Sequence, residues 1–153
     1  MAFKKYANLH VLRLRNNTIS SIHVDALSSL SQLQTLDLAN NLLSSVPTEV
    51  LSKLPHLLNL NLAGNNLMLI PDEAFLGMKN LKFLDLSGNR IGDLEPNALV
   101  GLSKLQVCTL KLSVSLSLSL CLCLSLSLSL SGMHFEGLSL SLSTLCVCDN
   151  LNL

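Results

Sequence analysis

The chain repeats itself every 24 residues over much of its length, and this periodicity constrains the fold more than any other feature. Each of four repeats carries leucines at three fixed positions, an asparagine three positions after the last leucine, and then two more apolar residues. The leucines are Leu9, Leu12, Leu14, Leu33, Leu36, Leu38, Leu57, Leu60, Leu62, Leu81, Leu84 and Leu86. The asparagines are Asn17, Asn41, Asn65 and Asn89. Such a sequence is expected to stack one structural unit per repeat into a solenoid.

The central L-x-L alternation of each repeat predicts a short strand, with the leucines buried and the intervening residues facing outward. We therefore expect parallel strands near residues 11–15, 35–39, 59–63 and 83–87, and a weaker one near 107–111. Asparagine amides can donate and accept hydrogen bonds where the chain leaves each strand, so the four asparagines are predicted to form one buried column. The second half of each repeat returns the chain along the opposite side, and prolines at 47 and 71 begin two of these segments.

The segments LHVLRLRNNTISSI, LQTLDLANNLLSSVP, LLNLNLAGNNLMLIP and LKFLDLSGNRIGDLEP resemble the leucine-rich repeat family, in its 24-residue "typical" subclass. The resemblance covers residues 2 to about 112. It implies an α/β solenoid: a curved right-handed superhelix with a parallel β-sheet on the concave side and irregular or short helical segments on the convex side. Family members of this subclass are mostly extracellular or receptor-ectodomain proteins that bind other proteins. The resemblance therefore implies an extracellular or cell-surface location and a protein partner.

The repeat phase predicts the domain organisation. Residues 1–112 are assigned to leucine-rich repeats, with a partial lead-in at 1–8, full repeats at 9–32, 33–56, 57–80 and 81–104, and a half repeat at 105–112. The chain lacks the signal peptide and the cysteine-bearing cap that the resemblance implies, so we expect it to be a fragment. Without a cap, the apolar side of the first strand is expected to be open to water.

Residues 113–131 form a Ser/Leu low-complexity segment, and residues 132–153 form a tail. A dinucleotide tract of alternating T and C is read as alternating UCU and CUC codons, so it encodes alternating serine and leucine in every reading frame. We therefore interpret the segment as encoded by a microsatellite and as having no selected function. One alternative is a membrane span over 112–133, a segment of 22 uncharged residues that has about the required length but is rich in serine. The other is an ordered β element with leucines on one face. The tail matches the repeat pattern out of phase from Leu142 to Asn150, as a degenerate repeat would.

Composition argues against several function classes. The chain has 10 basic and 10 acidic residues, so it lacks the basic excess of a phosphate-binding surface and no nucleic-acid partner is expected. The histidines fall at scattered repeat positions and no glycine-rich phosphate loop is present, so we predict no catalytic residues, no cofactor and no enzymatic activity. Cys108 replaces a core leucine and is interpreted as a buried, inert thiol. The Cys-x-Cys pairs at 121/123 and 146/148 lack the spacing of structural zinc sites, so no metal site is predicted.

The outward residues of the predicted strands are the candidate partner-binding residues. They are Arg13, Arg15, Thr35, Asp37, Asn59, Asn61, Phe83 and Asp85. Phe83 is the strongest candidate anchor, because it is an aromatic side chain among polar neighbours. The alternative for each position is an ordinary solvated strand residue. Parallel register places Arg13 beside Asp37 and predicts a contact between them, on a face that is basic at its N-terminal edge and acidic further along.

Three interpretations of the whole chain follow. The leading one is a protein-binding leucine-rich repeat module, a partial extracellular or receptor ectodomain that recognises a protein through its concave face. The second is a non-functional product of a truncated or mispredicted gene. The third is a membrane-anchored receptor fragment with 112–133 as its span. In the other two interpretations, the chain would be attached to a membrane only through parts of a longer protein. The glycosylation motif Asn16-Asn17-Thr18 would matter only in a secreted protein, and Asn17 is already assigned to the asparagine column.

Overall fold

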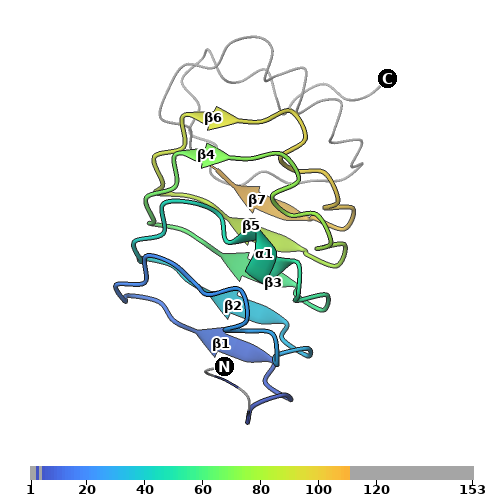
Figure 1. Cartoon of the computed structure of the whole chain (residues 1–153). Coiled ribbons are helices and arrows are strands. Elements are labelled where there is room, and N and C mark those ends of the chain that lie inside the picture. The colour runs from blue at the N-terminus through green and yellow to red at the C-terminus, as the bar shows by residue number, and fades with distance from the viewer. Residues whose placement is uncertain (1–2, 4, 111–153) are drawn as a thin grey trace.

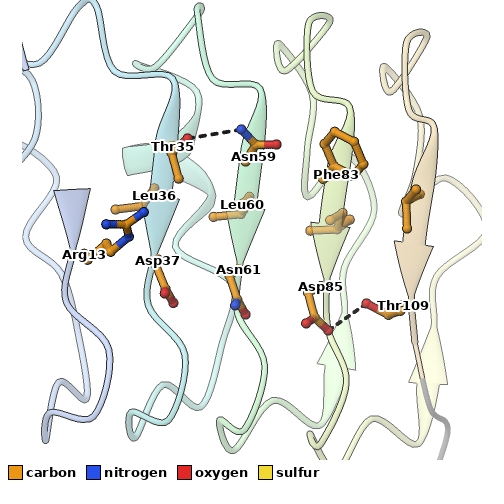
Figure 2. A pocket seen from close by; sticks show the side chains of 12 residues that line it. Arg13, Thr35, Leu36, Asp37, Asn59, Leu60, Asn61, Phe83, Asp85 and Thr109 are labelled. Carbon is orange, nitrogen blue, oxygen red and sulfur yellow. Dashed lines mark hydrogen bonds between the residues drawn. The ribbon is translucent and has the colours of Figure 1, made fainter. Parts of the chain in front are cut away.

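A computed structural model describes residues 3 and 5–110, which form a solenoid of stacked turns (Figure 1). Five strands make one parallel sheet in the order β1-β2-β3-β5-β7. They are β1 (Val11–Arg13), β2 (Thr35–Asp37), β3 (Asn59–Asn61), β5 (Phe83–Asp85) and β7 (Val107–Thr109). Each residue pairs with the one 24 positions further along, as in Leu36 with Leu60 (Figure 2). The parallel sheet and its register confirm the predicted solenoid, although each strand has three residues rather than five.

The returning half of each turn is mostly irregular. In the second repeat it contains the short helix α1 (Thr48–Leu51), preceded by Pro47 at φ −78°. In the third and fourth repeats it contains β4 (Leu69–Ile70) and β6 (Asp93–Leu94), which pair in parallel as a second, two-stranded sheet. The helical turn agrees with the prediction, whereas this second sheet was not predicted. It forms where Ile70 and Leu94, 24 residues apart, are both buried and bring their backbones into register.

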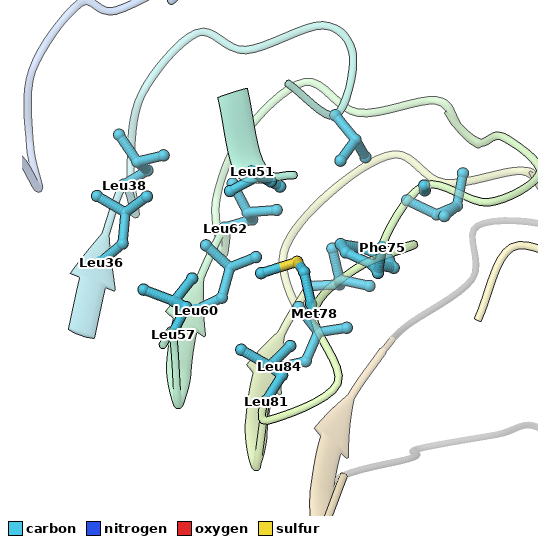
Figure 3. Close-up of a cluster of buried hydrophobic side chains, with 14 of the residues drawn as sticks. Leu36, Leu38, Leu51, Leu57, Leu60, Leu62, Phe75, Met78, Leu81 and Leu84 are labelled. Atoms are coloured by element: carbon cyan, nitrogen blue, oxygen red, sulfur yellow. The ribbon is translucent and has the colours of Figure 1, made fainter. Parts of the chain in front are cut away.

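The core lies between the two sides of the solenoid and is built from equivalent apolar residues of successive turns (Figure 3). The strand leucines Leu36, Leu60 and Leu84 are at most 2% exposed, and Phe75 is fully buried. The first turn is less well covered, because only one neighbouring turn packs against it. Leu12 is still buried, but Leu14 is only partly buried, so the expectation of near-complete burial is wrong for that leucine.

Asparagine side chains link successive turns in the interior. The Asn65 amide nitrogen donates to the carbonyls of Leu62 (2.9 Å) and of Leu38 in the preceding turn (3.0 Å), and Asn65 Oδ1 accepts the backbone N–H of Leu43 (3.0 Å). Asn41 makes the equivalent bonds to the first turn, and both side chains are 4% exposed. The buried column is confirmed at these two positions.

At the other two predicted positions the column is not fully buried. Asn89 makes the same set of bonds but is only partly buried. Asn17 is exposed and bonds only to the carbonyls of Leu14 and Arg15. Its buried placement was a wrong prediction, because an asparagine of this column is enclosed by the preceding turn and Asn17 belongs to the first complete turn.

A second column, just after the strands, has left-handed backbone conformation. Asn16, Asn40, Gly64 and Gly88 occupy equivalent positions with φ between 53° and 66°. Asparagine and glycine are the residues that adopt this conformation at least cost. The side chains of the two asparagines are bonded to each other, since Asn40 Nδ2 donates to Asn16 Oδ1 at 2.8 Å.

On the returning side, one ion pair links the first two repeats among the described residues. Lys53 Nζ lies 3.0 Å from Asp25 Oδ1, and both side chains are well exposed. The hydrogen bond from Lys53, followed by its charge, lowers the pKa of Asp25. Because both groups face solvent, this pair adds little to stability.

Cys108 lies in the core behind β7, as predicted, and is 2% exposed. Burial, with a smaller contribution from the Asp85 charge, raises the pKa of the Cys108 thiol to about 12. The thiolate is the reactive form, so at about pH 8 native Cys108 should resist iodoacetamide, whereas unfolded chain should react. Peptide mass mapping of alkylated protein checks this. Equal labelling of the Cys108 peptide with and without denaturant would show that the thiol is accessible.

The remaining expectations about the C-terminal part lie outside the described residues. They concern the low-complexity segment 113–131, the tail 132–153, the candidate span 112–133 and the cysteine pairs at 121/123 and 146/148. Within residues 3 and 5–110, no helix has the length and hydropathy needed to cross a membrane.

Candidate functional site

The outward residues of the five-stranded sheet form two columns, and all of them except Val11 line a shallow groove of about 410 Å³ (Figure 2). The first column consists of Val11, Thr35, Asn59, Phe83 and Val107, and the second consists of Arg13, Asp37, Asn61, Asp85 and Thr109. Between the columns, the main chain of Leu36, Leu60 and Leu84 forms the floor of the groove, because the side chains of these leucines are buried on the other face. The pleat creates this arrangement because alternate residues of a strand point to opposite faces.

Within the groove, from β2 to β7, the first column changes from polar to apolar. Asn59 Nδ2 donates to Thr35 Oγ1 at 3.1 Å, which fixes both side chains on β2 and β3. Phe83 follows on β5 with 44% of its surface exposed, and Val107 lies opposite it on β7. An exposed aromatic ring beside a valine gives this end of the groove an apolar surface.

The second column consists largely of side chains that are held by their own backbone. Asp37, Asn61 and Asp85 each accept, through Oδ1, the N–H of the residue two positions further on, at 3.0 Å. Asp85 Oδ1 also accepts the hydroxyl of Thr109 at 2.7 Å (Figure 2). These bonds orient the side chains before any ligand arrives, which reduces the entropy lost on binding. The Oδ2 atoms of Asp37 and Asp85 have no hydrogen-bond partner among the described residues and stay available.

The predicted contact between Arg13 and Asp37 is not formed as an ion pair. The register is as expected, since the two residues are direct neighbours on β1 and β2. Arg13 extends toward β2, however, and no ion pair or hydrogen bond joins its guanidinium to the Asp37 carboxylate (Figure 2). The Asp37 carboxylate is held instead by the N–H of Ala39. This local bond competes well because an exposed ion pair gains little in water.

Most of the predicted site residues come together in the groove. Its lining includes Arg13, Thr35, Asp37, Asn59, Asn61, Phe83 and Asp85. Arg15 is exposed but does not line it. Val107 and Thr109 were missed, although the 24-residue period places them in phase with Phe83 and Asp85. Their signal was weak because the fifth repeat loses its pattern soon afterwards.

Chemically, the groove is suited to non-covalent recognition. It offers an apolar patch, one guanidinium, two carboxylates and several amide and hydroxyl groups. No cluster of three or more histidine, cysteine or acidic side chains that could hold a metal ion occurs within residues 3 and 5–110.

A leucine-rich repeat family model matches residues 7–67 and 55–113. The crystal structure of a TLR13–ssRNA13 complex is similar, with 32% identity, a TM-score of 0.70, and coverage of 74% of this chain and 16% of that one. The leucine-rich repeat domain of APL1B is similar with 28% identity, a TM-score of 0.65, and coverage of 73% and 34%. No curated protein sequence matches.

This chain therefore spans about a sixth and a third of the lengths of those two structures. One of the two is a complex with single-stranded RNA, so the comparisons do not support the expectation that nucleic acid is excluded as a partner.

Proposed function

Because this chain belongs to the leucine-rich repeat family, we propose that it is a non-enzymatic binding module that recognises a protein through the groove of its concave sheet. The module is part of a longer extracellular or cell-surface protein. The similarity to short stretches of two larger leucine-rich repeat structures supports this placement.

The proposal rests mainly on the exposure of the Phe83 side chain in the groove. Its ring is 44% exposed in the lining of the groove, beside Val107 and within a set of pre-oriented polar groups. Aromatic residues that a partner can bury are the typical energetic centres of protein interfaces. Polar groups around them exclude water and set specificity.

The charge of the groove favours a protein over a polyanion. Its lining contains one cation, Arg13, and two carboxylates, Asp37 and Asp85. Nucleic-acid sites gain most of their affinity from several lysines and arginines that neutralise phosphates, and this lining does not provide such a set. A protein partner with cationic side chains opposite Asp37 and Asp85 would be complementary.

Substitution of Phe83 tests the proposal. A photo-crosslinking amino acid at position 83 should capture a specific extracellular protein, whereas the same amino acid at the exposed position Leu76 should not, because Leu76 lies outside the groove. With the captured partner purified, Phe83→Ser should weaken binding at least about tenfold, since loss of an interface anchor costs more than about 1.4 kcal/mol.

Val11→Ser is the matched control. Val11 is 43% exposed and occupies the same column as Phe83, but it does not line the groove. The Val11→Ser variant should therefore bind the partner with unchanged affinity. Equal losses for the two variants would place the interface elsewhere. Single-stranded RNA serves as a competitor: displacement of the partner by RNA would indicate a nucleic-acid site instead.

A further inference from the structure

We infer that the side-chain amide of Asn16 is the acceptor of an N-linked oligosaccharide. This inference rests on the proposed extracellular location, because the modification is added in the secretory pathway. Asn16-Asn17-Thr18 is the one N-x-S/T motif in the sequence, and in this motif the first asparagine is modified. The acceptor is therefore Asn16 and not Asn17.

The structure shows that no residue of this motif is buried in the asparagine column, to which Asn17 was assigned from the sequence. Asn16, Asn17 and Thr18 are all exposed. Asn17 lies outside the buried part of the asparagine column and bonds only to carbonyls of its own turn. The motif consequently lies on the surface just after β1, where a bulky sugar can project into solvent.

The hydrogen bonds of Asn16 leave the reacting atom available. Its backbone N–H donates to the Ala39 carbonyl at 3.0 Å, and its Oδ1 accepts Asn40 Nδ2 at 2.8 Å. Asn16 Nδ2 has no hydrogen-bond partner among the described residues. The carbonyl half of the amide is thus held by the next turn, whereas the nitrogen half is free.

The equivalent positions of the other turns do not offer this arrangement. Asn40 uses its own Nδ2 for the bond to Asn16, and Leu42 follows it where the motif needs a hydroxyl residue. Gly64 and Gly88 have no side chain at this position. The first turn is therefore the single acceptor within this column.

The transfer is compatible with the folded turn. Asn16 Nδ2 forms a bond to the anomeric carbon of a lipid-diphosphate-linked oligosaccharide, the carbon–oxygen bond to the diphosphate breaks, and the lipid diphosphate leaves with the electron pair. One amide proton passes to a base of the transferase. Asn16 Oδ1 is unchanged by this reaction, so it can still accept the bond from Asn40.

The sugar would also restrict access to the sheet. Asn16 lies three residues after Arg13, the first residue of the groove lining. A glycan at this position would shield the N-terminal edge of the concave face and leave the surface from β2 to β7 accessible. Phe83 lies on β5, three strands from β1, and would stay exposed.

The test is cell-free translation of the full chain, fused to a cleavable signal sequence, with microsomes that supply the transferase and the lipid-linked oligosaccharide. We expect a mass increase that peptide-N-glycosidase removes, with conversion of Asn16 to aspartate in the peptide map. Thr18→Ala should abolish the increase without touching the left-handed residue, and Thr18→Ser should restore it. Asn17→Gln should retain it.

Two outcomes would overturn the inference. In the first, the chain is protected from added protease inside the microsomes but is not modified. In the second, the Thr18→Ala variant is still modified. These outcomes are independent of the proposed function, because the assay needs no binding partner. Conversely, the Phe83 binding experiment can be done on chain that carries no sugar.

Discussion

Replacing Phe75 by alanine is expected to lower the free energy of unfolding by about 3–5 kcal/mol. Phe75 is fully buried, and the equivalent positions in the other repeats are the buried leucines Leu27, Leu51 and Leu99. Its ring is thus one layer in a continuous column of the core (Figure 3). Alanine would leave a cavity between two turns that the solenoid backbone cannot close. Urea denaturation followed by far-UV circular dichroism measures the effect.

The chain itself supplies the control for this experiment. Because leucine occupies the equivalent position in three other repeats, Phe75→Leu should fit the same backbone and cost only about 1 kcal/mol. If the alanine and leucine variants unfolded at the same urea concentration, Phe75 could not be a tightly packed part of the core.

Asn65→Ala is expected to cost about 1–3 kcal/mol, because it leaves the buried backbone N–H of Leu43 without an acceptor. The Leu43 N–H would lose its acceptor. The Leu38 and Leu62 carbonyls would each keep one donor, the amides of Asn41 and Asn89. Water cannot easily replace the amide, since Asn65 is only 4% exposed. Thermal and urea denaturation report the loss.

Asn17→Ala is the matched substitution at the exposed position of the same column. Its two bonds are local, and the Leu14 carbonyl keeps a second donor, the amide of Asn41. We therefore expect a change within about 0.5 kcal/mol, as for ordinary surface substitutions. Similar losses at positions 17 and 65 would mean that burial does not determine the contribution of these asparagines.

The repeat predicted which positions are equivalent, but not how each one is covered. Asn17 and Asn65 share a sequence pattern, yet one is exposed and the other is enclosed by the preceding turn. Leu14 differs from Leu38 for the same reason. Coverage depends on the number of neighbouring turns, which the pattern within a single repeat does not express.

The candidate site was predictable in its columns and not in its contacts. The L-x-L alternation correctly placed Asp37, Phe83 and Asp85 on the outer face of the sheet. It could not show that Asp37 would bond to the N–H of Ala39 rather than to Arg13, because competing contacts of a few tenths of a kcal/mol decide such choices. The pairing of β4 with β6 was missed because two-residue strands leave almost no alternation in the sequence.

The asparagine bonds between turns run in one direction. Asn41, Asn65 and Asn89 each donate to a carbonyl 27 residues earlier and accept a backbone N–H 22 residues earlier. Each of these turns therefore carries the side chain that attaches it to the preceding turn. A gene encoding such a chain can therefore lengthen by duplication of whole repeats, and each new copy arrives with its attachment already encoded. An insertion between a strand and its asparagine would move the asparagine out of phase and break both of its hydrogen bonds to the preceding turn. An insertion in the returning segment could instead form a surface loop. Inherited length changes are thus expected to be whole repeats or to lie in the returning segments.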